Sequence, residues 1–269
     1  PATPASELLL STDDGVPVFK ITPDALLPIE RVQLLYSVDP DPQARFWRTA
    51  TATATKAGNV WSAPLPIPSV DQPLFAFANV HYRLEKSETV PFASPTKVFA
   101  ISSMLNTATP NDLQRAEVKA TDKADSVIDN FKHGWQDWYL LSANNPHHWE
   151  YSTRKLSDPK WQGQTGQRLV LDVRAEKPNE LVIMLTQNFF RPYRGKSQEF
   201  VAVVKLSGNG MQAISLTPND FLTADGEKLS SWKHVDLLSL RAYQDKGSKL
   251  LGSKNWDGPQ PTLCELRWH

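Results

Sequence analysis

The stretch Leu181-Val182-Ile183-Met184-Leu185 is apolar at every position. A strand with water on one side alternates apolar and polar residues, so a run that is apolar on both faces is typical of a central strand covered by other layers. Similar short apolar runs recur through the second half of the chain, over residues 169–173, 200–206, 214–216, 235–240 and 263–268. No helical period is sustained beyond about three turns. These runs predict a β-sandwich of two packed sheets.

Period-two runs also recur in the first half, from Pro17 to about Ala100. They are separated by proline-marked turns such as Asp39-Pro40-Asp41-Pro42. This rhythm predicts a small antiparallel sandwich. Residues 101–121 lose the alternation and become polar. We therefore expect an all-β chain with one domain over residues 1–103, a linker over 104–121 and a second domain over 122–269.

The charge balance argues against broad electrostatic binding. The 269 residues include 29 Lys plus Arg and 29 Asp plus Glu, and no run of about 18 apolar residues occurs. A chain without a basic field is not expected to hold nucleic acid or an anionic membrane surface. The 21 prolines and 9 tryptophans suit a protein of short strands that stacks sugars on aromatic rings.

The common catalytic motifs are missing from the sequence. It contains no Gly-x-Ser-x-Gly nucleophile elbow, no Gly-rich phosphate loop and no His-Glu-x-x-His string. We therefore predict no catalytic residue within this chain.

A set of short elements in the second half resembles a known family. Val127-Ile128-Asp129-Asn130-Phe131 is followed by Gly134-Trp135 and Asp137-Trp138, and the pattern continues through Gly163, Gly166 and the apolar runs named above. Together these elements resemble the galactose-binding-like jelly-roll carbohydrate-binding modules, especially those of family 11. The resemblance covers residues 122–269. It implies a jelly-roll fold and a polysaccharide or oligosaccharide ligand.

Three segments of the first half resemble a second family. Residues 45–48 (RFWR), 61–66 (WSAPLP) and 74–80 (LFAFANV) look like the immunoglobulin-like domain found downstream of α/β-hydrolase esterases in some bacterial proteins. This resemblance implies that the chain is a non-catalytic accessory region of a secreted carbohydrate-active hydrolase or esterase, with the nucleophile upstream of Pro1. The expected location is secreted, periplasmic or at the cell surface.

A sugar site pairs exposed aromatic rings with planar polar groups, and three segments have that mixture: residues 142–164, 187–196 and 243–257. We expect Trp135, Trp138, Trp232 and Trp268 to be core residues. The alternative for every aromatic residue is packing in the core or at its rim. The candidate ligand-binding residues are Trp149, Tyr151, Trp161, Arg191, Tyr193, Arg194 and Trp256.

Modules of the resembled type often hold a structural calcium ion where the first and last strands meet. Asp122 and Asp129 lie near the first strand and Asp257 near the last, and carboxylate oxygens are the ligands that calcium prefers. The resemblance therefore suggests these three residues as calcium ligands. The alternative is a solvated acidic turn.

Two rival functions remain open at this point. The segment Phe189-Phe190-Arg191-Pro192-Tyr193-Arg194-Gly195-Lys196 has the residue types of a jelly-roll polysaccharide lyase, which needs a base and a cation beside a uronate carboxylate. A glycoside hydrolase would instead need two facing carboxylates. A third possibility is a purely structural spacer that packs on an upstream catalytic domain.

Overall fold

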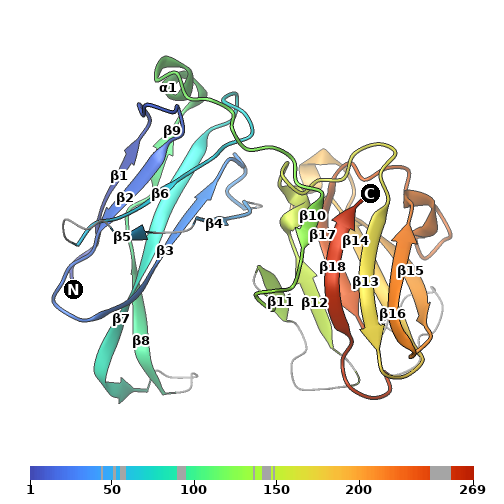
Figure 1. Cartoon of the computed structure of the whole chain (residues 1–269). Helices are drawn as coiled ribbons and strands as arrows, with labels where there is room; N and C mark the ends of the chain where they lie inside the picture. The colour runs from blue at the N-terminus through green and yellow to red at the C-terminus, as the bar shows by residue number, and fades with distance from the viewer. Residues whose placement is uncertain are drawn as a thin grey trace. The chain divides into compact units, whose positions relative to one another are not determined.

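Each apolar run of the second half is a β-strand in the computed structural model, and almost all regular structure in the chain is β. The structure describes residues 1–43, 45–50, 53–54, 59–89, 95–135, 137–140, 147, 149–242 and 256–269. It divides into two units, Pro1–Lys123 and Ala124–His269. The prediction of an all-β chain built from antiparallel sheets is confirmed (Figure 1).

The first unit consists of two antiparallel sheets. One has the order β1 (Ala5–Leu9), β2 (Val18–Thr22), β6 (Trp61–Pro64) and β5 (Thr53–Ala54). The other has the order β4 (Arg48–Ala50), β3 (Ile29–Ser37), β7 (Leu74–Glu88) and β8 (Thr96–Ser102), and β9 (Asn106–Ala108) also pairs with β7. Along β7 the buried positions are every second residue from Leu74 to Tyr82. This period of two places one face of β7 in the core between the sheets.

The segment predicted as a linker is packed onto the first unit. Within residues 104–121, β9 pairs with β7, and the short helix α1 (Pro110–Arg115) buries Leu113 in the core of that unit. Thr109 caps α1, because its side chain accepts a hydrogen bond from the Asp112 backbone. The prediction of a linker over 104–121 is corrected. The polar composition reflects the exposed face of this segment, whereas Leu113 and Val118 anchor it.

The second unit also has two antiparallel sheets. The first sheet has the order β10 (Val127–Asp129), β18 (Thr262–Trp268), β13 (Leu169–Ala175) and β16 (Gly210–Leu216). The second has the order β11 (Trp138–Leu140), β12 (Glu150–Thr153), β17 (Val235–Arg241), β14 (Asn179–Gln187) and β15 (Gln198–Leu206). Three single turns of 3-10 helix, η1 (Lys155–Ser157), η2 (Pro192–Arg194) and η3 (Pro218–Asp220), lie between strands. This arrangement fits a jelly roll.

The core of the second unit lies between its two sheets. Leu181, Ile183 and Leu185 of β14 point into it, and Leu169, Leu171 and Val173 of β13 face them. Trp138, Trp232 and Trp268 are buried there as predicted, whereas Trp135 is half-buried and stacks on Tyr151. On the opposite face of β14, Val182 and Met184 form a second small cluster with Val201. The apolar run at residues 181–185 is therefore buried on both sides of the sheet.

The outer edge of the second sheet is covered at β15. Val201 of β15 and Leu222 exchange two backbone hydrogen bonds, at 2.8 and 3.0 Å between nitrogen and oxygen. Leu222 in turn bridges to Lys228, and Leu229 and Phe221 are buried beside it. The segment 221–229 therefore occupies part of an edge that would otherwise present unpaired backbone groups.

Candidate binding face of the second unit

The structure places four of the predicted ligand-binding residues in the interior. Trp149 and Trp256 are 0% and 1% exposed, and their rings meet edge to face at 5.1 Å between centroids. Tyr151 is also buried, and its ring stacks on Trp135. Arg191 is buried beside Asp236, with 3.6 Å between its Nη1 and the Asp236 Oδ2. The prediction that these four side chains meet a ligand at the surface is corrected, because core and ion-pair contacts occupy them.

The other three candidates lie at or near the surface. Trp161 is half-buried against the core. Tyr193 is 68% exposed, and Arg194 beside it in η2 is also exposed. Of the three segments proposed to form the site, residues 142–146, 148 and 243–255 lie outside the described residues. The described part of the first segment contains a strand, β12, where a loop was expected.

The three predicted calcium ligands are each paired with a different basic residue. Asp122, in the first unit, contacts Arg48 at 2.6 Å. In the second unit, Asp129 contacts Lys155 at 2.7 Å and Asp257 contacts Lys177 at 2.9 Å. Within the described residues no group of three acidic, His or Cys side chains is placed to hold a metal ion. Calcium binding by these residues stays a prediction.

A different set of polar side chains meets on the second sheet of this unit. Trp149, directly before β12, and Tyr151 within it pack into the core, so Glu150 and Ser152 point the other way. The strand register places Ser152 opposite Ser239, and Glu150 opposite Arg241. We call this side of the sheet the outer face. Its members are Tyr139, Glu150, Ser152, Ser239, Arg241, Leu237, Glu180, Val182, Met184, Thr186, Glu199, Val201, Val203 and Lys205.

The centre of the outer face is polar yet largely buried. Glu150 Oε1 lies 2.6 Å from Arg241 Nη2, and their side chains are 9% and 15% exposed. The hydroxyls of Ser152 and Ser239 are 2.7 Å apart. Charged groups on the surface of a sheet are normally in contact with water. Arg267 and Glu265 on the opposite sheet are examples, because both are partly exposed. The polar centre of the outer face is therefore shielded from water.

One end of the outer face is closed by the segment after β14. The backbone nitrogens of Phe189 and Phe190 donate to the two carboxylate oxygens of Asp236, at 2.9 and 3.3 Å. Burial raises the pKa of the Asp236 carboxyl, and these hydrogen bonds and the nearby guanidinium of Arg191 lower it in part. Asp236 therefore fixes residues 189–191 against the end of the sheet.

Arg154 lies at the same end, directly after β12. Its guanidinium carbon sits 3.9 Å from the centroid of the Phe190 ring. Its Nε and Nη2 atoms are buried and have no hydrogen-bond partner in the described part of the chain. The same holds for the Nε of Arg241 and the hydroxyl of Thr186. Buried donors without partners cost about 1–3 kcal/mol each, so these atoms favour an additional partner.

Apolar and aromatic groups flank the polar centre. Val182, Met184 and Val201 form an apolar strip on the β14 and β15 side. Tyr139, at the β11 edge, is 50% exposed, and Phe189 is 46% exposed. The outer face thus combines hydrogen-bonding groups with exposed rings, which is the composition that a saccharide requires.

The sequence reasoning missed Glu150, Ser152, Arg154, Ser239 and Arg241. Glu150, Ser152 and Arg154 could have been found from the alternation of residues 149–154. Aromatic residues at 149 and 151 with polar residues between them indicate a strand with one buried face and one polar face. Ser239 and Arg241 join them only through the register of β12 and β17, and no sequence pattern gives that pairing.

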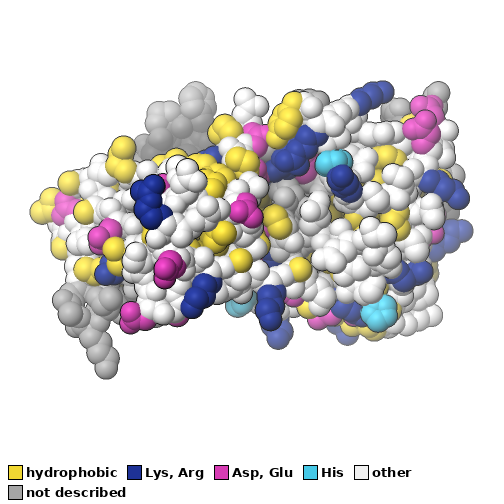
Figure 2. Space-filling view, turned by 90° about the horizontal axis from the view of Figure 1, so that it is seen from above, with side chains coloured by type: hydrophobic (Ala, Val, Ile, Leu, Met, Phe, Trp, Pro, Cys, Tyr) yellow, Lys and Arg dark blue, Asp and Glu magenta, His cyan; other side chains and the backbone are white. Residues whose placement is uncertain are grey.

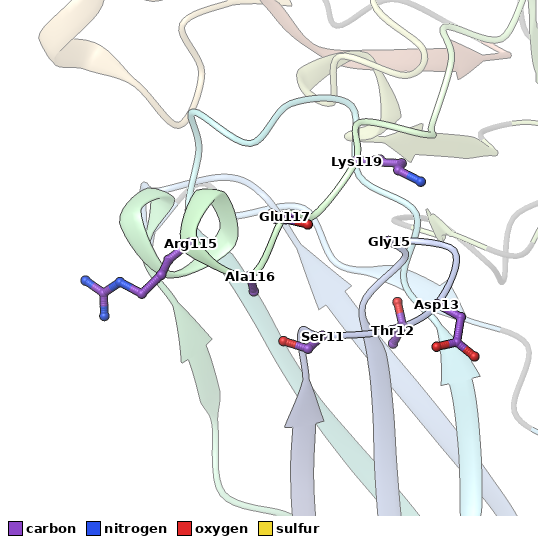
Figure 3. A pocket seen from close by; sticks show the side chains of 8 residues that line it. All are labelled: Ser11, Thr12, Asp13, Gly15, Arg115, Ala116, Glu117 and Lys119. Atoms are coloured by element: carbon purple, nitrogen blue, oxygen red, sulfur yellow. The ribbon is translucent and has the colours of Figure 1, made fainter.

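A cavity of about 410 Å³ also lies in the first unit, beside α1. It is lined by Ser11, Thr12, Asp13, Gly15, Arg115, Ala116, Glu117 and Lys119. Figure 3 shows that the side chains of Arg115 and Lys119 point away from each other. The charged groups do not converge on one point, so this cavity is not a candidate site.

Comparison with known proteins adds one weak similarity. No protein-family model matches the sequence, and no curated protein matches it. The chain is similar to a solved structure described as "Structural basis for the promiscuous specificity of the carbohydrate-binding modules from the beta-sandwich super family", with 9% identity and a TM-score of 0.31, over 100% of this chain and 98% of the other. This TM-score is too low to support a conclusion about the ligand.

Among the described residues, no helix is long and apolar enough to cross a membrane. Figure 2 shows basic and acidic side chains interspersed over the described residues of the face in view. Neither sign forms a continuous field there, in line with the equal numbers of acidic and basic residues in the sequence.

Proposed function

We propose that the second unit binds carbohydrate on its outer face. The observation that carries the proposal is the shielded polar centre of that face, which has unpartnered donors on Arg154 and Arg241 and lies beside the exposed ring of Tyr139. Sugars present hydroxyl edges to such donors and CH faces to such rings.

We further propose that the chain is a non-catalytic accessory region. In this proposal the second unit is a galactose-binding-like jelly roll of the family 11 type, which holds a neighbouring hydrolase or esterase domain of the same polypeptide on polysaccharide. The location would be secreted, periplasmic or at the cell surface. The support is the sequence resemblance of residues 122–269 together with the sandwich architecture of the unit.

For the first unit we propose an immunoglobulin-like spacer. Its sheets have the orders β1-β2-β6-β5 and β4-β3-β7-β8. Lettering the strands A, B, C, C′, D, E, F and G in chain order gives A-B-E-D and C′-C-F-G, which is the strand distribution of immunoglobulin-like sandwiches. The strand order supports this assignment independently of the sequence resemblance.

The proposal is tested by affinity electrophoresis and calorimetry of the whole chain against plant and algal polysaccharides. Tyr139→Ala removes an exposed ring, and we expect about tenfold weaker binding. The matched control is Met211→Ala, which removes an exposed apolar side chain from the other sheet and should leave binding unchanged.

Two results would overturn the proposal. One is a folded chain that binds none of the polysaccharides. The other is binding that Tyr139→Ala and Met211→Ala weaken equally. Release of new reducing ends or of unsaturated products during the assay would instead support an enzyme.

A further inference from the structure

Charged side chains of both signs lie on the outer face and its closing segment. Three arginines lie there, namely Arg154, Arg191 and Arg241. Glu150 pairs with Arg241, and Asp236 pairs with Arg191. Arg154 has no ion pair within the described residues.

Arg154 is held in place without being neutralised. The ring of Phe190 lies against its guanidinium group, which favours a cation but supplies no hydrogen-bond acceptor. Asp236 also interacts electrostatically with Arg154, and its oxygens accept from two backbone nitrogens and face Arg191. A partly buried guanidinium with unpartnered donors favours an anion as its partner.

Basic and acidic side chains both lie near this end of the sheet. Burial lowers the pKa of His234, the charges of Lys233 and Arg194 lower it further, and the carboxylate of Asp236 opposes the shift. The backbone nitrogen of Asn188 donates to the His234 carbonyl at 3.1 Å, which places the segment after β14 beside these basic residues.

We propose that the saccharide bound by the outer face carries an anionic group, a uronate carboxylate or a sulfate ester, and that Arg154 pairs with this group. This inference rests on the proposed carbohydrate binding. A guanidinium group recognises both anions through parallel N–H donors, so the shared chemistry is an oxyanion on a sugar ring.

The test compares three classes of glycan on the whole chain: uronate polymers such as polygalacturonate and alginate, sulfated galactans, and neutral β-glucans. We expect at least tenfold tighter binding to one anionic class than to the neutral one, and weaker binding as salt rises from about 50 to 500 mM. Arg154→Met should abolish this preference, whereas Arg154→Lys should keep part of it.

The matched control is Arg174→Met. Arg174 is exposed on β13 of the other sheet, so this variant loses the same charge away from the outer face. It should bind anionic glycans as the native chain does. Circular dichroism and thermal unfolding of each variant establish that it is folded.

The outcomes separate the two proposals. Binding of neutral glycans in preference to anionic ones overturns the anionic ligand and leaves carbohydrate binding intact. Equal losses for Arg154→Met and Arg174→Met overturn the role of Arg154. A folded chain that binds no glycan of any class overturns both proposals.

Discussion

Buried charges at single residues decide how the outer face is held together. Asp236 is the clearest case, because it is 2% exposed and receives two backbone hydrogen bonds as well as the charge of Arg191. Removing one member of a buried pair leaves the other charge without compensation, which is more costly than the loss of an exposed pair.

We expect Asp236→Asn to lower the free energy of unfolding by about 3 kcal/mol, since the buried Arg191 would lose the carboxylate that it faces at 3.6 Å. Urea denaturation at neutral pH measures the change. Asp257→Asn is the control, because its ion pair with Lys177 is exposed at the surface, and it should cost less than about 1 kcal/mol. Similar losses for the two variants would contradict the role given to Asp236.

A second residue predicts a pH dependence. Burial raises the pKa of the Asp137 carboxyl above its ordinary value of 3.8, and Lys155 opposes the shift in part. The folded chain therefore binds this proton more tightly than the unfolded chain does. The stability that Asp137 contributes is complete below the unfolded pKa and is lost as the pH rises through the folded pKa.

In Asp137→Asn the side chain at this position is neutral at every pH. The free energy of unfolding of the variant, compared with that of the native chain at the same pH, should therefore be more favourable at about pH 7 than at about pH 3. Asp137 has a φ of 65°, which Asn tolerates well, and this backbone effect is the same at both values of pH. Urea unfolding of both chains between these two pH values separates the effect of the Asp137 ionisation from the backbone effect. A stability difference that is constant with pH would refute the prediction.

At the scale of elements, the long apolar runs could be predicted and the short amphipathic strands could not. The runs at 181–185 and 200–206 are continuous, and they correspond to β14 and β15. β12 is short and begins after aromatic residues that equally suit a sugar-binding loop, so Trp149 was predicted at the surface. The outer face joins side chains from β12, β14 and β17, and their contacts depend on strand register. The register pairs residues about 90 positions apart between β12 and β17 and about 50 to 60 apart between β14 and β17.

Gly163 belongs to a connection that packs closely on the strands. A Cβ atom there would lie 2.7 Å from Trp268 Cη2 and 2.8 Å from Trp232 Cγ. Both rings are buried, so Gly163→Ala should lower the free energy of unfolding by about 2 kcal/mol. Gly166→Asn is the control, because Gly166 has a φ of 86° and open space around it, and we expect a change under about 1 kcal/mol. Chemical denaturation followed by tryptophan fluorescence compares the two variants.

At the scale of the whole molecule, the chain has two separate hydrophobic cores, one in each unit. Seven of the nine tryptophans come after residue 124, so tryptophan fluorescence reports mainly on the second unit. Circular dichroism, in contrast, reports on the strands of both units. The two signals therefore allow the units to be followed separately during unfolding.

Leu34→Ala truncates a fully buried side chain in the core of the first unit. We expect a loss of about 3 kcal/mol in that unit, with an earlier transition by circular dichroism and little change in the main fluorescence transition. Leu181→Ala in the second unit should give the reverse pattern. Coincident shifts in both signals for both variants would show that the units unfold as one.

The backbone bridge between Val201 and Leu222 affects how copies of the chain behave in concentrated solution. An uncovered strand edge can template the addition of a strand from another molecule, and repeated addition leads to fibrils. Because residues 221–229 occupy part of the β15 edge, strand addition there first requires that segment to detach. Self-association at this edge therefore requires local unfolding of residues 221–229. Hydrogen exchange at the Val201 and Leu222 amides measures the free energy of that local unfolding.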